Sequence, residues 1–251
     1  MKAAIKNELT KLFNHKKYFV FMVIGVIISV FWSFLGNMIV KGLSALAGGM
    51  VYMELGFTPT SSLPLFARVL LPLLIFMGVS DLFTGEFADS TVKASLIRPL
   101  HRVKLFSAKA LAVLTYTALY LGVILVVGVV TGLISGAVRT PAAFLGAAGS
   151  YALTLIPLAV LTAFAVMVSL MFKSGSLVMF LLILSMLFFS ALPLIIPRIN
   201  DLLFTNYLTW YRMWLGSVPP LGKMINVIVI LLGYGAVFTF GGMLIFERRD
   251  V

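Results

Sequence analysis

Six long apolar runs are the feature that most restricts what this chain can fold into. They lie at residues 18–40, 63–83, 105–135, 150–172, 177–196 and 224–246. A helix needs about 20 such residues to cross the hydrocarbon core of a bilayer. Of the 251 residues, 61% are hydrophobic and 11% are charged, whereas soluble domains have about 45–50% and about 25%. The sequence therefore predicts an all-α integral membrane protein with six transmembrane helices in a single domain, residues 1–251.

Basic residues are distributed unevenly over the segments between these runs. If the N-terminus is cytoplasmic, thirteen of the 19 lysines and arginines fall on the cytoplasmic side, as the positive-inside rule requires. An even number of spans then returns the C-terminus to the cytoplasm. The net charge of +11 follows from this topology and from attraction to anionic membrane lipid. No nucleic-acid partner is expected.

The N-terminal segment, residues 1–17, has the pattern of an amphipathic helix. Ile5, Leu9 and Leu12 recur on one helical face, and lysines lie off its edges. This pattern is typical of an interfacial helix that lies flat on the membrane. Glu8 is spaced to pair with Lys11 on the next turn, and an exposed pair of that kind adds little stability. A solvated basic leader that only sets topology is the alternative.

The largest polar segment on the predicted cytoplasmic side lies between the second and third runs, at residues 85–104. It reads GEFADSTVKASLIRPLHRVK. Asp89 and Thr91 can cap a short helix through their side-chain oxygens. Such a helix would end near Arg98, because Pro99 disfavours helix at the residue before it. The sequence predicts a short cytoplasmic helix here, and a plain topology-setting loop is the alternative.

On the other side, residues 198–223 are rich in aromatic residues that favour the membrane interface. Tyr207, Trp210 and Trp214 are among them, and Arg212 lies in their midst. The segment is too mixed to be a span. It predicts an amphipathic or re-entrant outer helix that ends before Pro219 and Pro220, with an ordinary aromatic loop as the alternative.

Few charged residues lie inside the runs. Arg68 and Asp81 are expected at opposite boundaries of the second span, because thirteen positions along a helix separate them by about 20 Å. Lys109 is expected at the inner end of the third. A stripe of Gly128, Gly132 and Gly136 favours close helix packing or a dimer contact.

Motifs for catalysis and metal binding are missing from the sequence. There are no cysteines and only two histidines. The chain has no phosphate loop, no H-E-x-x-H zinc motif and no G-x-S-x-G elbow. We expect no catalytic residues, no metal site and no enzyme activity in this chain by itself.

The combination of these features resembles the permease subunits of bacterial type 2 ATP-binding cassette (ABC) exporters. The N-terminal helix and the six-span layout match, and so does the order of residues in the polar segment, where Gly85-Glu86, Thr91, Leu96, Pro99 and Arg102 follow one another. In that family the segment is a coupling helix that docks on a separate ATPase subunit. The resemblance implies that the residues in contact with the ATPase are Glu86, Asp89, Thr91, Lys93, Arg98 and Arg102, with Asp81 at the edge.

The resemblance also implies what works with this chain. A separate ATPase would hold ATP and Mg²⁺, and a second permease subunit, identical or related, would complete a pathway in the bacterial cytoplasmic membrane. The implied substrate is amphipathic: an antimicrobial peptide, a drug or a lipid-like compound. Two other functions stay open, an ion-coupled secondary transporter and a membrane scaffold without transport. The spans lack a central charge of the kind that ion-coupled transport uses.

Overall fold

The computed structural model describes residues 2–46, 60–85, 102–134, 140–214 and 221–248, and these parts are helical with short turns and no strand. Six of the helices are long and apolar enough to cross a membrane. The chain is therefore a multi-pass, all-helical membrane protein, as the apolar runs predict.

The first span is preceded by a short helix, α1 (Lys2–Asn14), and forms α2 (Lys16–Leu46). The second span is one nearly continuous helix of four pieces: α3 (Leu63–Leu65), η1 (Phe66–Leu70), α4 (Leu71–Val79) and η2 (Ser80–Gly85). The remaining elements are α7 (Arg102–Ile134), α8 (Pro141–Ser169), α9 (Gly175–Ile195), η3 (Pro197–Ile199), η4 (Phe204–Trp214) and α10 (Leu221–Arg248).

Capping residues explain where two of the spans begin. Thr140 accepts a hydrogen bond from the backbone N–H of Ala143, and Pro141 occupies the first helical position, which its fixed φ favours. Helix α8 therefore begins before the fourth apolar run. Ser174 caps α9 in the same way through the N–H of Leu177.

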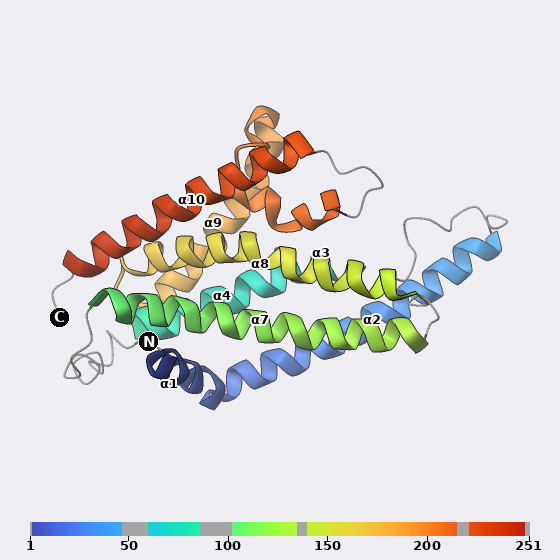
Figure 1. The fold of residues 1–251 in the computed structure, drawn as a ribbon, viewed down its shortest axis with the longest axis horizontal. Coiled ribbons are helices and arrows are strands. Elements are labelled where there is room, and N and C mark those ends of the chain that lie inside the picture. Colours follow the sequence, from blue (N-terminus) through green and yellow to red (C-terminus); the bar gives the residue numbers. More distant parts are fainter. Residues whose placement is uncertain (1, 47–59, 86–101, 135–139, 215–220, 249–251) are drawn as a thin grey trace.

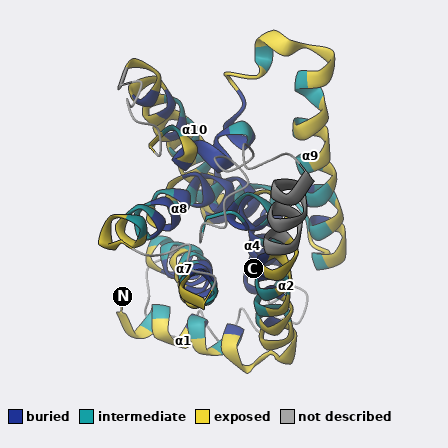
Figure 2. Ribbon diagram, turned by 90° about the vertical axis from the view of Figure 1, so that its right-hand side faces the viewer, coloured by how far each residue is buried: buried dark blue, intermediate teal, exposed yellow. Residues whose placement is uncertain are grey.

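The spans run back and forth along one long axis (Figure 1). α1, the end of the second span, the start of α7 and the end of α10 lie at one end, which we call the α1 end; the opposite end is the far end. The second span and α8 form most of the core, whereas α2, α9 and α10 expose long apolar faces (Figure 2). Such faces are stable in lipid, which is as apolar as they are.

Helix α8 is held against η4 by a hydrogen bond that a proline makes necessary. Pro157 lies inside α8 and has no N–H, so the carbonyl of Leu153 loses its helical partner. The indole Nε1–H of Trp210 donates to that carbonyl at 2.8 Å. The bond satisfies a backbone group that would be costly to leave unpaired in a membrane.

Helices α2 and α7 approach closely at a glycine. A Cβ at Gly25 would lie 1.8 Å from the hydroxyl oxygen of Tyr120, and Tyr120 is fully buried. Only glycine therefore fits there. Farther along, Ser33 and Thr131 join the two helices by a hydrogen bond of 3.1 Å.

Candidate functional site

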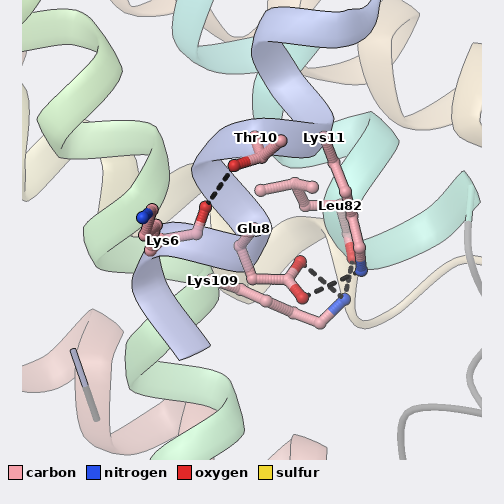
Figure 3. A network of polar contacts seen from close by, with 6 residues as sticks. All are labelled: Lys6, Glu8, Thr10, Lys11, Leu82 and Lys109. Carbon is pink, nitrogen blue, oxygen red and sulfur yellow. Dashed lines mark hydrogen bonds and ion pairs between the residues drawn. The ribbon is translucent and has the colours of Figure 1, made fainter. Parts of the chain in front are cut away.

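Charged side chains gather at the α1 end, where α1 packs against α7. Glu8 lies 2.8 Å from the Nζ of Lys11 and 3.9 Å from the Nζ of Lys109 (Figure 3). The predicted pairing of Glu8 with Lys11 is confirmed. The expectation that this pair is exposed is wrong, because Glu8 is only 3% exposed and lies on the face of α1 that packs on α7.

Lys109 connects α1 to the end of the second span. Its Nζ donates to the carbonyl of Leu82 at 2.5 Å and lies 5.8 Å from the centre of the Phe83 ring. Leu82 belongs to η2, and carbonyls at the C-terminal end of a helix carry partial negative charge that attracts a cation. Lys109 lies near the α1 end, as expected, but its 4% exposure makes it a buried ion rather than a boundary residue.

A second ion pair joins η2 to the start of α2. The Nζ of Lys17 lies 2.6 Å from Asp81, and the hydroxyl of Tyr18 donates to the same carboxylate at 2.5 Å. Tyr116 of α7 donates to the carbonyl of Tyr18 at 3.1 Å. We call the combined set the junction; its members are Glu8, Lys11, Lys17, Tyr18, Asp81, Leu82 and Lys109.

Two further hydrogen bonds extend from η2 to the remaining core helices. Ser80 donates to the carbonyl of Gly175, at the start of α9, at 2.8 Å. Thr84 donates to the carbonyl of Ser169, at the end of α8, at 3.3 Å. The six residues of η2 thus make polar contacts with four helices: α2, α7, α8 and α9. η2 is π-helical, and short π-helical turns often mark functional sites.

The junction borders the polar segment that the sequence singles out. η2 ends at Gly85, and α7 begins at Arg102. The predicted ATPase-contacting residues Glu86, Asp89, Thr91, Lys93 and Arg98 fall outside the described residues. Of that set the structure places only the backbone of Arg102, in the first turn of α7.

The aromatic segment that the sequence predicts as an outer helix follows α9 and packs beside the middle of α8. Within it, η4 consists of two short 3-10 turns joined by a kink at Thr209. Its aromatic side chains are mostly buried against α8. That the segment is an amphipathic or re-entrant helix on the outer side stays a prediction. Arg68 is exposed, as expected, and donates to Thr209 at 3.4 Å.

The hydroxyl of Tyr211 in η4 lies close to two arginines. Burial raises its pKa, while the positive charges of Arg212 and Arg68 act in the opposite direction. Tyr211 therefore stays protonated at neutral pH and serves as a buried packing residue of η4.

Of the glycine stripe, Gly128 and Gly132 are buried within α7, whereas Gly136 falls outside the described residues. Burial in the single chain accounts for these two glycines by packing among its own helices. A role in a dimer contact stays a prediction.

The junction holds helices together through ion pairs and hydrogen bonds. In the described parts of the chain, no three His, Cys, Asp or Glu side chains come close enough to share a metal ion. Its carboxylates are already engaged by lysines and a tyrosine. What the arrangement can do is join the helices on either side of residues 86–101 to each other and to the rest of the core.

Sequence reasoning finds part of the junction. The pairing of Glu8 with Lys11 was predicted but its burial was missed, although the position of Glu8 on the same helical face as Ile5 and Leu12 could have indicated it. Asp81 and Lys109 are recognisable as charges near the ends of spans. Their partners are not, because Lys17 and Asp81 lie 64 positions apart and meet only through the packing of whole helices.

Comparison with known proteins gives a family for the chain. A family model described as "Protein of unknown function (DUF2705)" matches residues 24–251. The matched part contains Asp81, Leu82 and Lys109 of the junction. No curated protein matches the chain.

Proposed function

This chain belongs to the DUF2705 family of proteins of unknown function, and we propose that it is the membrane-spanning permease subunit of an ABC exporter. In this proposal the chain has no catalytic activity of its own. A separate ATPase subunit binds ATP and Mg²⁺, and a second permease subunit completes the pathway in the bacterial cytoplasmic membrane. The α1 end would face the cytoplasm.

The observation that carries the proposal is the position of the junction on both sides of residues 86–101. An ATPase in another chain can drive a permease only through a surface that it touches and a connection that carries its motion. Residues 86–101 supply the candidate surface, with acidic, basic and hydroxyl groups between two spans. The junction supplies the connection, since η2 and α7 are bonded to each other through Leu82 and Lys109.

The contacts of η2 suggest how a local push would spread. A displacement of residues 86–101 would act on η2 directly, and from there on α2 through Asp81. Ser80 and Thr84 would carry it to α9 and α8. Packed helices with buried polar bonds respond as units rather than by gradual deformation. A short segment could thereby change the packing of most of the molecule.

The proposed substrate is an amphipathic compound: an antimicrobial peptide, a drug or a lipid-like molecule. The composition favours such a substrate over an ion, because the charged residues of the described spans lie toward the ends of those helices. Apolar walls stabilise an amphiphile by burial, whereas a permeant ion requires polar or charged ligands in the membrane.

The proposal is tested by reversing the charge of the candidate surface. Glu86→Lys and Asp89→Lys together should reduce co-purification of an ATPase with the tagged chain from its native membrane, while membrane insertion stays normal. Asp201→Lys is the matched control, because Asp201 is an exposed acid between η3 and η4, far along the chain from residues 86–101. An ATPase bound at normal yield to the double variant would show that this segment is not the dock.

A second variant separates docking from transmission. Lys109→Met removes the bond to Leu82 but leaves residues 86–101 unaltered. We expect the ATPase to remain bound while substrate-stimulated ATP hydrolysis falls. Unchanged stimulation in a properly folded variant would contradict the role of the junction.

A further inference from the structure

A groove between α7, α8 and α10 has a volume of about 980 Å³. α8 lies between the other two helices (Figures 1 and 2) and forms the floor. The groove extends along α7 from Phe106 to Ala118, along α8 from Leu155 to Val166, and along α10 from Ile228 to Phe240. Its volume lies near the upper end of the range for ligand pockets, about 300–1,000 Å³.

The chemistry of the lining selects an apolar occupant. No charged side chain lines the groove, and its hydroxyls come from Thr115, Thr162 and Thr239. Thr115 already donates to the carbonyl of Leu111 at 2.7 Å, and Thr162 to that of Leu158 at 2.8 Å. The floor therefore offers van der Waals contact and few polar groups, and hydrocarbon is the material that fits it.

The length of the groove along α7 is close to the thickness of one leaflet of a bilayer. From Phe106 to Ala118 a helix rises about 18 Å, and half of the hydrocarbon core is about 15 Å thick. Phe106 lies near the start of α7, and Val166 lies near the end of α8. Along α7 and α8 the groove therefore lies in the part of the span near the α1 end, whereas along α10 it is centred on the helix. Its open side faces the lipid tails.

Two exposed lysines lie at the same end, where the head group of a lipid would be. Lys104 is in the first turn of α7, and Lys173 follows the end of α8. Lys104 precedes Thr115 by eleven positions, which places the two residues on one face of the helix. A cation at this level attracts an anionic head group.

From the apolar lining, the one-leaflet length and the two lysines, we propose that this groove binds an acyl chain of an anionic phospholipid from the leaflet at the α1 end. The proposal concerns the chain by itself. It holds whether or not an ATPase works with it, so the test uses no ATPase.

The test is photolabelling of the full chain in nanodiscs with phosphatidylglycerol that carries a photoreactive group on its acyl chain. Labelled peptides are mapped by mass spectrometry. We expect more label on the groove-lining stretches of α7, α8 and α10 than on the exposed apolar face of α9 that includes Phe180 and Phe188. Labelling that is uniform over all lipid-facing surfaces would overturn the proposal.

A matched pair of variants tests the groove itself. Ala159→Phe places a ring on the floor of the groove. If the ring displaces two methylene groups of the acyl chain, the lipid should bind about tenfold more weakly. Ala152→Phe makes the same change on the same face of α8, two turns toward the far end and outside the groove. We expect the first to lose groove labelling and the second to keep it. Ala159 is partly packed, so its replacement could disturb the fold. Ala236→Phe, at an exposed position of the groove, should lower the groove labelling without that effect. Retained labelling in both groove variants would refute the site.

The role of the two lysines in binding the lipid head group is tested by comparing an anionic with a zwitterionic lipid. The unmodified chain should label more strongly with phosphatidylglycerol than with phosphatidylcholine, and Lys104→Gln with Lys173→Gln should abolish that preference. Equal labelling by the two lipids in the unmodified chain would show that the lysines do not select an anionic head group.

Discussion

At the residue scale, the buried ion pair of Glu8 and Lys109 requires other groups to offset the cost of removing two charges from water. Each side chain is less than one-tenth exposed, and a charge so placed is costly unless it is paired and hydrogen-bonded. Lys11 and the carbonyl of Leu82 supply the additional contacts. Loss of Glu8 would leave Lys109 buried without a carboxylate, and loss of Lys109 would leave Glu8 with Lys11 alone and the Leu82 carbonyl without its donor. Either loss costs more than the intact pair contributes.

Lys109→Met should therefore lower the stability of the chain by about 2 kcal/mol, because the buried Leu82 carbonyl loses its donor; thermal unfolding in mild detergent measures the loss. Adding Glu8→Gln should recover part of the loss, because the neutral amide leaves no buried negative charge that needs the ammonium group of Lys109. The coupling energy between the two sites should be about 1–3 kcal/mol. Lys6→Met, on the exposed side of α1, is the control and should be nearly neutral. Strict additivity of the two changes would show that the pair does not interact.

At the element scale, η4 supplies a hydrogen-bond donor that the long helix α8 lacks at its proline. Pro157 leaves the carbonyl of Leu153 without its helical donor, and Trp210 provides one from another element. Aromatic composition alone suggests the membrane interface for this segment. The compensation of a proline by a distant indole is a tertiary relationship, so the burial of η4 could not be read from its own sequence.

Trp210→Phe should destabilise the chain by about 1 kcal/mol or more, because a buried carbonyl loses its donor. In a Pro157→Ala background the same change should cost less, since an alanine at that position restores the helical N–H. Thermal unfolding of the four variants measures this difference. Trp214→Phe is the matched control, because Trp214 is exposed at the end of the same element. An equal cost of Trp210→Phe in both backgrounds would contradict the compensation.

At the scale of the whole molecule, six spans place α1 and the end of α10 at one end of the bundle (Figure 1). The length and hydropathy of the apolar runs were sufficient to predict this architecture, because a bilayer admits few alternatives. The junction was predictable only in part. The i, i+3 pair of Glu8 and Lys11 is local, whereas the contacts of Asp81 and Lys109 depend on how whole helices pack.

The charge distribution predicts that the α1 end is cytoplasmic. The chain contains no cysteine, so single cysteines report position without background. A cysteine replacing Lys6 should resist a membrane-impermeant maleimide in intact cells, and one replacing Lys223 should react. Disruption of the membrane should make the first reactive, which controls for burial. The opposite pattern would invert the topology and move residues 86–101 away from any cytoplasmic ATPase.

The central claim is that this chain works with an ATPase in a separate polypeptide. A pull-down of the tagged chain from its native membrane in mild detergent, with every co-eluting protein identified by mass spectrometry, tests it most directly. The account predicts a stoichiometric soluble protein that carries a phosphate loop. Recovery of the chain without such a protein, reproducibly and in more than one detergent, would contradict the claim and favour a self-contained transporter.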